Sequence, residues 1–490
     1  MFELPPDEGE PSLVVIGGGP AGLTAAYEYQ KLSPGSRALV FEGNDIVGGI
    51  SRTESYKGFR FDIGGHRFFT KVPEVEAMWH EVLGDDLMIV PRSSRIYYRG
   101  RFFDYPLKLF NALTNIGAYE AIRIVLSYIK WQIRRDRADV SFEDWVINRF
   151  GGRLYMHFFK SYTEKVWGID PKHIQADWAA QRIRNMSLFK AVWNAISGAN
   201  DTASLIEEFL YPRLGPGQMW ERTADLIEER GGEVRLRHWV RGILRDGTRV
   251  TGIEVQDAGG TRQTVPTHNV VNTMSLRDMV AAFDPPPPPE VVEAADRLKY
   301  RDFLIVTLVL DRPDPFPDNW IYVHSGDVKV GRIQNFRAWS PQMLPDDTKA
   351  SIGMEYFCQE GDGLWTSADD DLHALATKEL VALGLARDDD VIDGTVIRQP
   401  KAYPVYDTDY RAAVDTISAW VDTLENFQCV GRNGQHRYNN QDHSMLTAML
   451  AARNILGATN DVWSVNVERS YHEEFELPKD QAGVAQKARA

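Results

Sequence analysis

The chain has 490 residues, enough for about three structural units at roughly 150 residues each. Apolar residues make up 43% and charged residues 25%, a balance typical of a globular protein. A chain of this length can bury a stable core without disulfide bonds or a structural metal ion. The 55 Lys and Arg residues against 69 Asp and Glu residues give a net charge of −14, which argues against general attraction to nucleic acid or anionic membranes. An anionic small ligand is compatible with this charge if a few arginines gather around it.

Cysteine content and the N-terminus bear on the compartment of the protein. Cys358 and Cys429 could form at most one disulfide and cannot make a zinc site of cysteines alone, so a reducing compartment is the simpler interpretation. The N-terminal sequence MFELPPDEGEPS lacks the basic and apolar regions of a signal peptide. No stretch approaches about 18 uncharged apolar residues, so we expect no membrane-spanning helix and a cytoplasmic location.

The beginning of the chain predicts a β-strand, a tight turn and an α-helix. Residues Leu13–Ile16 are a short apolar run, three glycines follow, and small helix-compatible residues come next. A second apolar run, Ala38–Phe41, ends in Glu42. This order is a βαβ unit, the opening of a doubly wound parallel sheet.

Helical periodicity dominates from residue 106 to about residue 213. In this part Phe142 and Phe150 fall on one face of a helix, which either Asp139 or Ser141 could cap. We therefore expect a helical insert between two parts of the first domain.

The apolar segment 119–133 permits two interpretations, because it runs directly into the basic sequence RRDR. One interpretation, which we favour, is an amphipathic helix packed on the rest of the protein with a basic end. The other is a helix that lies on a membrane surface.

Strand-like sequence returns after the helical part. Residues 233–255 predict two strands joined at Asp246-Gly247, and residues 269–273 resemble a buried parallel strand. The sequence DPPPPPE at 284–290 predicts a stiff linker and a boundary. Beyond it, the runs FLIVTLVL, WIYV and ASIGMEYF predict a second sheet.

The glycines after the first strand match a dinucleotide-binding motif in its required context. The motif Gly17-x-Gly19-x-x-Gly22 follows a strand and opens a helix, and Glu42 ends the next strand. Gly17 permits the turn, Gly19 lets backbone approach a pyrophosphate, and Gly22 lets the helix pack closely on the sheet. The helix N-terminus favours the phosphate charge, and Glu42 would accept hydrogen bonds from a ribose. The motif alone predicts NAD or FAD.

Two further glycine pairs favour FAD. The segments GGISRT at 48–53 and FDIGGH at 61–66 let backbone lie flat along an extended cofactor. Their order resembles the FAD family that includes amine oxidases, protoporphyrinogen oxidase and UDP-galactopyranose mutase. Motif and resemblance together imply that the FAD-binding residues are Gly17, Gly19, Gly22, Glu42, Gly49, Ser51, Gly65, Val240, Gly431, Arg432, Gln441 and Ser444.

This resemblance implies an α/β fold with a Rossmann-like FAD-binding domain, a helical insert and a second β-sheet domain for the substrate. The FAD-binding domain would be assembled from discontinuous pieces. The expected pieces are 1–105, 214–299 and 416–490 for the FAD-binding domain and its C-terminal tail, 106–213 for the helical insert, and 300–415 for the sheet domain.

Within this superfamily, several short segments resemble the UDP-galactopyranose mutases, especially the longer eukaryotic-type enzymes. Their shared order along the chain is the specific signal. Lys108 and Trp339 stand where those enzymes carry a glutamine and a tyrosine, so the nucleotide base and the sugar stay open. The segments are GGHRFF (64–69), RIYYRGRFFDYP (95–106), YTEKVWGIDP (162–171), AQRIR (180–184), NWIY (319–322), AYP (402–404) and GRNGQHRYNNQDHS (431–444).

Carried over residue by residue, the resemblance implies a substrate site. Arg182 and Arg332 would bind a diphosphate, and Tyr403 and Tyr438 would donate hydroxyls to it. Charge-assisted hydrogen bonds of about 1.5–3 kcal/mol each could bind such an anion to an acidic protein. His66 would lie beside the flavin ring, or else hold its own loop by a hydrogen bond. The other implied substrate-binding residues are Arg95, Trp167, Asn194, Trp320 and Tyr322.

The resemblance implies a sugar-nucleotide mutase that interconverts pyranose and furanose rings without net redox, through an adduct between N5 of the reduced FAD and the sugar. NAD(P)H would be the external reductant. The alternative is an oxidase or desaturase of the amine oxidase or protoporphyrinogen oxidase type, and a third class is a non-catalytic flavin-stabilised scaffold. The expected partner is a nucleotide sugar, with no nucleic acid and no metal, and a homo-oligomer stays open.

Overall fold

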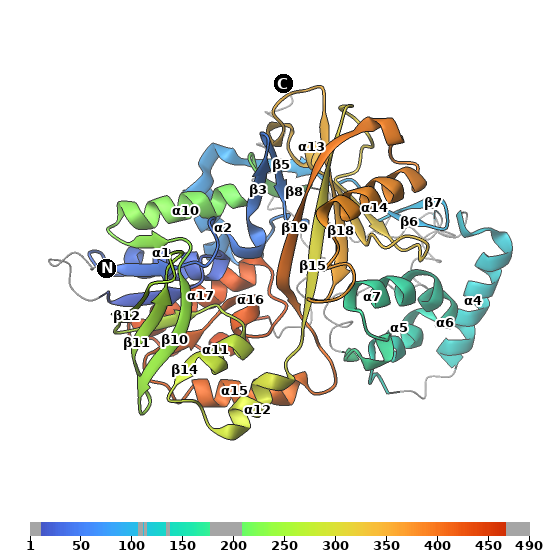
Figure 1. The fold of residues 1–490 in the computed structure, drawn as a ribbon. Coiled ribbons are helices and arrows are strands. Elements are labelled where there is room, and N and C mark those ends of the chain that lie inside the picture. The colour runs from blue at the N-terminus through green and yellow to red at the C-terminus, as the bar shows by residue number, and fades with distance from the viewer. Residues whose placement is uncertain (1–10, 106–110, 112–114, 134–137, 177–207, 467–490) are drawn as a thin grey trace.

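The computed structural model describes residues 11–105, 111, 115–133, 138–176 and 208–466. Figure 1 shows two β-sheet regions side by side and a group of helices beyond the second. The first region combines segments from the beginning, middle and end of the chain, as its blue, green and red elements show. The expected α/β fold class, with a Rossmann-like domain, helical insert and second sheet, is confirmed.

The core of the first region, within the described residues, is a five-stranded parallel sheet in the order β20-β13-β1-β2-β9. Both of its faces are buried: Leu13 and Val15 face one hydrophobic cluster, and Val14 and Ile16 face another. This explains why these strands are continuous apolar runs in the sequence. The strands are β1 (Leu13–Ile16), β2 (Ala38–Phe41), β9 (Glu233–Arg235), β13 (Val270–Asn272) and β20 (Phe427–Cys429).

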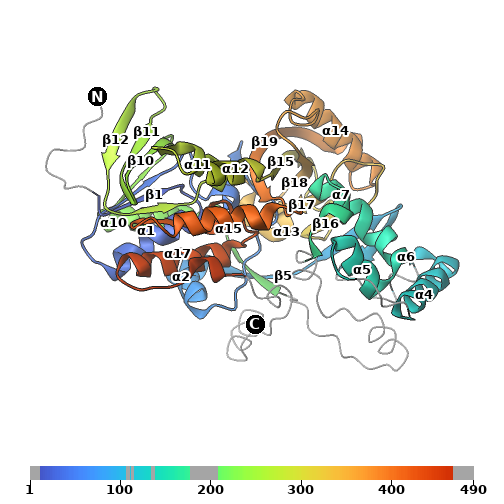
Figure 2. The ribbon, with the colours of Figure 1, turned by 90° about the horizontal axis from the view of Figure 1, so that it is seen from below.

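Helices cover one face of this parallel sheet, and an antiparallel sheet with further helices covers the other. Figure 2 shows α1, α2 and α17 on one side of β1, and the antiparallel strands β10–β12 with α11 and α12 on the other. The first layer is α1 (Pro20–Leu32), α2 (Pro73–Leu83), α10 (Gly217–Glu229) and α17 (Gln441–Ile455). The second is β10 (Trp239–Asp246), β11 (Arg249–Gln256), β12 (Arg262–Pro266), β14 (Phe283–Asp284), α11 (Leu276–Ala282), α12 (Pro289–Arg297) and α15 (Tyr410–Val421).

The second region, in the described part of the chain, is a seven-stranded sheet in the order β19-β15-β18-β17-β16-β6-β7. Its strands pair antiparallel, apart from the parallel pair of β16 and β6. Helix α14 covers one face. The elements are β6 (Ser94–Tyr98), β7 (Arg101–Asp104), β15 (Tyr300–Leu310), β16 (Trp320–Val323), β17 (Arg332–Asn335), β18 (Ala350–Cys358), β19 (Val391–Pro404) and α14 (Asp369–Ala382).

The helical region follows the sequence expectation at α5 and differs from it in part at α4. The cap of α5 is Ser141, not Asp139: its hydroxyl accepts from the Asp144 backbone N–H at 3.1 Å, and the Asp144 carboxylate accepts from the Ser141 N–H. In α4, the packed interpretation of 119–133 holds for one face, where Ile124 is buried and Tyr128 and Trp131 pack against the same hydrophobic cluster as α5. The opposite face differs from that interpretation, because apolar side chains are exposed on it. The helices are α4 (Ala118–Ile133), α5 (Phe142–Phe150), α6 (Gly152–Leu154) and α7 (Lys160–Trp167), with a short π-helical turn at Tyr155–Phe159.

Two expected domain boundaries differ from the pairing that the structure shows. Strands β6 and β7 pair into the second sheet, although the sequence assigns residues 1–105 to the FAD-binding domain. Helix α15 lies on the first region and continues to Val421, although the sheet domain is expected to reach 415. The first difference arises because β6 pairs with β16 across more than 200 residues of sequence, and the second because Ala413, Ile417 and Val421 of α15 pack into a core cluster of the first region; no local composition break marks either contact.

The structure shows the state of the two cysteines and the character of the described helices. Cys358 and Cys429 are both buried and free. In the described part of the chain, none of the helices combines the length and apolar character needed to cross a membrane.

A buried carboxyl group joins three elements of the first region. Asp62 ends β4 (Phe59–Asp62), which pairs with β3 (Thr53–Tyr56). Its carboxyl oxygens accept hydrogen bonds from Thr53 Oγ1 at 2.9 Å and from the hydroxyl of Tyr211, on β8 (Glu208–Pro212). Burial raises the pKa of Asp62 to about 7, because desolvation outweighs the two hydrogen bonds.

Replacing Asp62 with asparagine should reduce the pH dependence of stability between pH 5 and pH 8. The folded wild type holds this proton up to about pH 7 while the unfolded chain loses it near pH 4, so its free energy of unfolding falls as pH rises through that window. The fall amounts to about 4 kcal/mol at most. Urea denaturation of both proteins at several pH values measures it, and equal pH slopes would show that Asp62 does not titrate in this range.

Candidate active site

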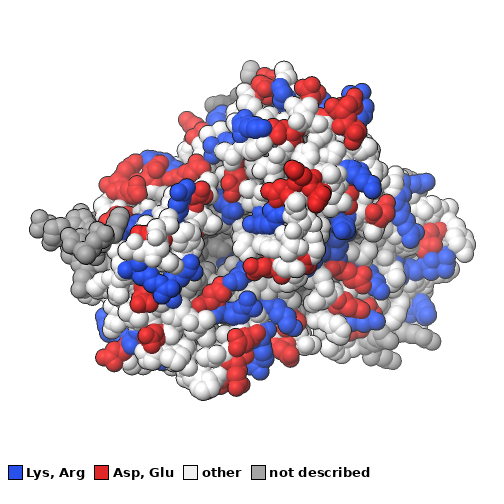
Figure 3. All heavy atoms as spheres, in the orientation of Figure 1, with Lys and Arg blue, Asp and Glu red and all other residues white. Residues whose placement is uncertain are grey.

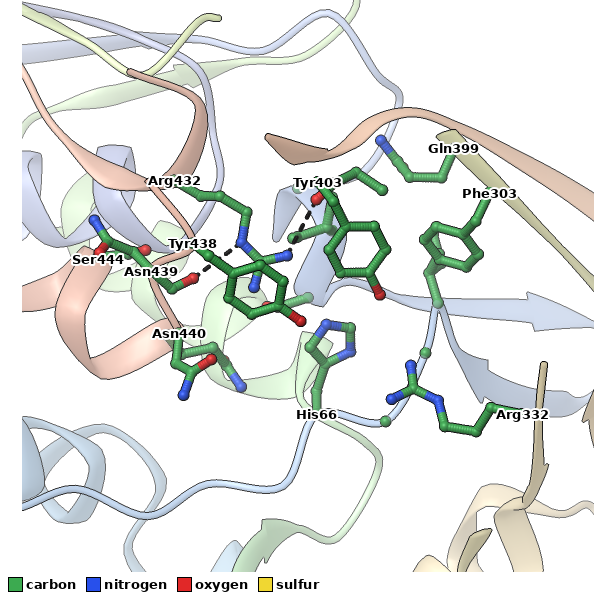
Figure 4. A pocket seen from close by; sticks show the side chains of 18 of the residues that line it. His66, Phe303, Arg332, Gln399, Tyr403, Arg432, Tyr438, Asn439, Asn440 and Ser444 are labelled. Atoms are coloured by element: carbon green, nitrogen blue, oxygen red, sulfur yellow. Dashed lines mark hydrogen bonds between the residues drawn. The ribbon is translucent and has the colours of Figure 1, made fainter. Parts of the chain in front are cut away.

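A cavity of about 570 Å³ lies where the parallel sheet, the second sheet and the helical region meet. This volume is in the range of ligand-binding cavities. Each region contributes to its lining: Gly19 at the start of α1, Tyr162 on α7, Arg332 on β17 and Tyr403 on β19, with His66 on the loop after β4. Figure 4 shows part of this lining.

The dinucleotide motif forms one end of the cavity. Gly17 has φ of +103°, and a Cβ there would lie 2.1 Å from the hydroxyl oxygen of Thr273. A Cβ at Gly22 would lie 1.9 Å from the Gly17 carbonyl oxygen, so the fold itself requires both glycines. Gly19 is different, because a Cβ there would make only ordinary contact with Gly49, at 3.6 Å from its Cα. Gly19 therefore keeps backbone open to the cavity.

Glu42 is held in place beside this motif. Its Oε2 accepts from the Gly18 N–H at 2.7 Å, and its Oε1 accepts from the backbone N–H and side-chain amide of Asn44. The Gly48 N–H donates to the Gly18 carbonyl at 2.8 Å, which fixes the Gly48–Ser51 turn against the dinucleotide loop. Glu42, Gly49 and Ser51, three of the residues predicted to bind the cofactor, all line the cavity.

The C-terminal part of the chain closes the same end. Gly431, Arg432, Gln441 and Ser444 line the cavity. The guanidinium of Arg432 donates to the carbonyl oxygens of Asn439 (2.9 Å) and Ala402 (3.1 Å), so it ties this segment to β19 (Figure 4). The first turn of α17 lines the cavity, and the side-chain oxygen Oε1 of Gln441 is buried there without a hydrogen-bond partner among the described residues.

These features suit a dinucleotide such as FAD. The first turns of α1 and α17 both line the cavity, and neither helix has a side-chain cap among the described residues, so their N-termini can face phosphates. Glu42 presents an oriented carboxylate for a ribose. The buried oxygen of Gln441 offers a further acceptor to the bound group.

His66 and Arg332 occupy the middle of the cavity. Burial, together with the positive charges of Arg432 and Arg332, lowers the pKa of His66 to about 3, so its imidazole is neutral near pH 7. Its Nδ1 is buried without a hydrogen-bond partner among the described atoms. Gly64 and Gly65 precede it, and both line the cavity.

Arg332 is positioned by a carboxylate behind it. Glu355, on the neighbouring strand β18, is fully buried and accepts from Arg332 Nε at 2.9 Å and from Nη2 at 2.6 Å. Gln334 donates to the same carboxylate at 2.8 Å. The carboxylate raises the pKa of Arg332 well above its usual value despite burial, so the guanidinium stays charged.

Aromatic side chains enclose this centre. The rings of Tyr403 and Tyr438 stack at 5.4 Å with 19° between their planes, and Trp167 lies 6.2 Å from Tyr403. Figure 4 shows the phenolic oxygens of both tyrosines and the guanidinium of Arg332 directed toward His66. The four groups therefore converge from four separate segments of the chain.

A second aromatic group in the lining contains the predicted Tyr322 and two residues that sequence reasoning missed, Tyr162 and His324. Tyr162 stacks on His324 with centroids 4.3 Å apart, and Tyr322 packs against Tyr162 edge to face. Burial and the nearby Lys165 lower the pKa of His324 to about 3. Tyr162 begins one of the segments that resemble the mutases, so that resemblance could have suggested it, whereas the isolated His324 carries no local signal.

Some predicted residues lie away from the cavity lining. Arg95 is held by Asp318 at 2.6 Å, and Trp320 stacks on Trp339 within a hydrophobic cluster. Val240 lies on β10, also outside the lining. Two further predicted residues, Arg182 and Asn194, lie outside the described part of the chain.

Comparison with known proteins identifies the family. The model of the family described as flavin-containing amine oxidoreductases matches residues 20–390, most of the chain. The chain belongs to this family. It is therefore an FAD-dependent enzyme of the amine oxidase superfamily, and the flavin cofactor expected from the glycine motifs is supported.

A curated relative carries an oxidase name. The "Putative flavin-containing monoamine oxidase AofH" of Mycobacterium tuberculosis is 29% identical over 300 residues, which is 58% of this chain and 61% of that protein. The chain thus matches about three fifths of the relative's length.

Two solved structures share the fold of this flavoenzyme. A reduced UDP-galactopyranose mutase superposes with a TM-score of 0.80 at 18% identity, covering 94% of this chain and 98% of that one. A "Putative protoporphyrinogen oxidase" from Exiguobacterium sp. 255-15 gives 0.69 at 16% identity, covering 90% and 98%. At these identities the likeness concerns the fold.

Proposed function

We propose that this flavoenzyme is a sugar-nucleotide mutase resembling UDP-galactopyranose mutase, which interconverts pyranose and furanose forms without net redox. The observation that carries the proposal is the convergence of Arg332, Tyr403 and Tyr438 on His66 in one cavity. An arginine and two phenols are the donors that a diphosphate needs. The shared fold with a reduced UDP-galactopyranose mutase over 94% of the chain supports it.

The charge of the cavity also supports an anionic substrate. Among the described residues, four arginines line it against two carboxylates, although the whole chain carries −14. Part of this positive charge would face the cofactor's own pyrophosphate. The lining arginines are Arg52, Arg67, Arg332 and Arg432, and the lining carboxylates are Glu42 and Asp442.

In the proposed reaction, bound FAD, kept reduced by NAD(P)H as external reductant, would supply a nucleophilic nitrogen, N5, for the anomeric carbon of the sugar. Arg332 stabilises the negative charge of the departing diphosphate, and Glu355 holds its guanidinium in orientation. Tyr403 and Tyr438 donate hydroxyls to the same oxygens. Because the imidazole of His66 is neutral, it adds no third positive charge beside Arg332 and Arg432. Arg182 would be the second arginine that binds the diphosphate.

The proposed cycle predicts that ring isomerisation requires reduced flavin yet consumes no stoichiometric reductant. Dithionite-reduced protein, incubated anaerobically with a panel of sugar nucleotides, should yield ring isomers over many turnovers. Chromatography of the products together with absorbance of NAD(P)H measures both quantities. Consumption of NAD(P)H or oxygen in step with product would contradict the mutase proposal.

A second candidate is an oxidase of an apolar amine or related substrate. It is favoured by the apolar and aromatic side chains that line the cavity on the helical side, among them Ile96, Phe142, Phe158 and Phe159. The oxidase name of the curated relative agrees with it. Oxygen consumption with peroxide release on adding amines would distinguish it from the mutase.

A further inference from the structure

Helix α4 presents an apolar stripe to the outside of the molecule. Spacings of three and four residues place its members on one helical face. Within α4, Ile124 is the residue that is buried. The members of the α4 stripe, with their exposed fractions, are Tyr119 (74%), Ile122 (60%), Leu126 (60%), Ile129 (47%) and Ile133 (79%).

The position of α4 makes this stripe accessible to a large partner. Figures 1 and 2 both show α4 at the outer edge of the helical region, on the side away from the parallel sheet. Single exposed apolar residues are ordinary, but five on one stripe at the edge of the molecule mark an interaction surface.

The charges around the stripe favour an anionic partner. Arg123 and Lys130 are exposed along one flank of α4, and the sequence RRDR at 134–137 follows the helix directly. The single acidic residue of α4, Glu120, accepts from Arg153 Nε at 2.5 Å and from the exposed Arg123 at a longer 3.4 Å, and it lies 3.0 Å from His157 Nε2. The exposed surface of α4 is therefore apolar and basic, unlike the acidic chain as a whole.

We propose that α4 docks this protein reversibly on an anionic lipid surface. The α4 stripe would enter the boundary between headgroups and acyl chains, and the basic flank would face the headgroups. A second copy of the chain fits less well, because a symmetric contact would bring Arg123 and Lys130 of both copies together, and Glu120, the acidic residue of α4, is already paired within its own chain.

The same arrangement would bring the active-site cavity near the lipid. Ile124, on the inner face of α4, belongs to one hydrophobic cluster with Phe142 and Phe158, and both of these phenylalanines also line the cavity. Docking through α4 therefore presents the apolar side of the cavity toward the membrane. The proposal does not depend on the reaction that the cavity catalyses.

Cosedimentation of the flavin-loaded protein with vesicles tests the proposal. The wild type should bind vesicles containing phosphatidylglycerol far better than vesicles of phosphatidylcholine alone, and 1 M salt should weaken the binding because it screens the charges. The double variant Leu126→Glu/Ile129→Glu should lose at least about tenfold in partitioning. The double variant Arg123→Gln/Lys130→Gln should lose about 30-fold on the anionic vesicles.

Ile392→Glu is the matched control, because Ile392 is 50% exposed, like Ile129, but lies on β19. It should bind vesicles as the wild type does, and flavin absorbance of all variants checks that they are folded. Equal binding of both vesicle types, binding by neither, or binding unchanged in Leu126→Glu/Ile129→Glu would overturn the proposal. A wild-type dimer that becomes monomeric in that variant would overturn it in favour of self-association.

Discussion

Replacing Arg332 with alanine is expected to weaken the binding of a nucleoside diphosphate by about 30-fold to several-thousand-fold. The guanidinium lies in the cavity beside His66, Tyr403 and Tyr438. Removing it would leave the diphosphate charge poorly compensated, at a cost of roughly 2–5 kcal/mol, and about 1.4 kcal/mol corresponds to each tenfold change in affinity. Titration calorimetry with UDP and other nucleoside diphosphates measures the effect.

The substitution has a second effect that the structure makes plain. Glu355 is fully buried, and its partners among the described residues are Arg332 and Gln334. Arg332→Ala leaves this carboxylate without its counter-charge, so we also expect a loss of stability of about 3–5 kcal/mol. Arg332→Lys keeps the charge and loses the planar fork, and should recover most of the stability but only part of the affinity.

Arg95→Ala is the control that separates the two effects. Arg95 lies on the same sheet and also pairs with a nearly fully buried carboxylate, Asp318, at 2.6 Å, but it is outside the cavity lining. It should therefore destabilise the fold without changing diphosphate affinity. Equal affinity in the wild type and Arg332→Ala, or no diphosphate binding by the wild type, would remove the sugar-nucleotide assignment and leave the flavin fold.

The first region of the fold could be predicted because its signals are local. The run Leu13–Ile16, the glycines after it and Glu42 define strand, turn, helix and strand within about 30 residues, as a βαβ unit requires. The place of β6 and β7 could not be predicted in this way. These strands form a hairpin with its turn at Arg99-Gly100, but the sheet that the hairpin joins is decided by the pairing of β6 with β16.

The candidate site shows the same contrast between local and long-range information. Residues that a motif fixes, such as Gly19, Glu42 and His66, line the cavity as expected. Arg95 was expected there by its segment, but it is paired with Asp318, which lies on the chain far from it. The aromatic pair of Tyr162 and His324 forms only when α7 packs on the second sheet.

The sequence alone does not determine whether the apolar face of α4 is exposed, for a similar reason. Periodicity shows that Ile122, Leu126 and Ile129 share a face, but not whether another element covers it. The net charge of −14 also suggested weak attraction to anionic membranes, yet it averages over the whole chain. Glu120, the one carboxylate of α4, is shared among Arg153, His157 and Arg123, so the exposed charge along this helix is basic, which no overall count reveals.

Replacing Gly19 with valine is expected to abolish flavin binding while leaving the fold intact. The backbone of Gly19 is extended (φ −84°, ψ −175°), a conformation that valine adopts readily, and its Cβ would meet Gly49 Cα at an ordinary 3.6 Å. The methyl groups would project into the cavity where the motif predicts the pyrophosphate. If valine displaces the pyrophosphate from the backbone of this loop, the loss of two charge-assisted hydrogen bonds between them implies at least about 100-fold weaker FAD binding.

Two comparisons make this result specific to the cofactor. Gly22→Val should instead prevent folding, because a Cβ there lies 1.9 Å from the Gly17 carbonyl oxygen, whereas Gly363→Val, at an exposed position with open space around its Cβ, should bind FAD normally. Visible flavin absorbance reports the cofactor, and circular dichroism reports the fold. Full flavin content in Gly19→Val would show that FAD does not lie against this loop. A colourless wild type that FAD cannot reconstitute would remove the flavin assignment altogether, because every other proposal for this cavity assumes that the α1 N-terminus holds the cofactor.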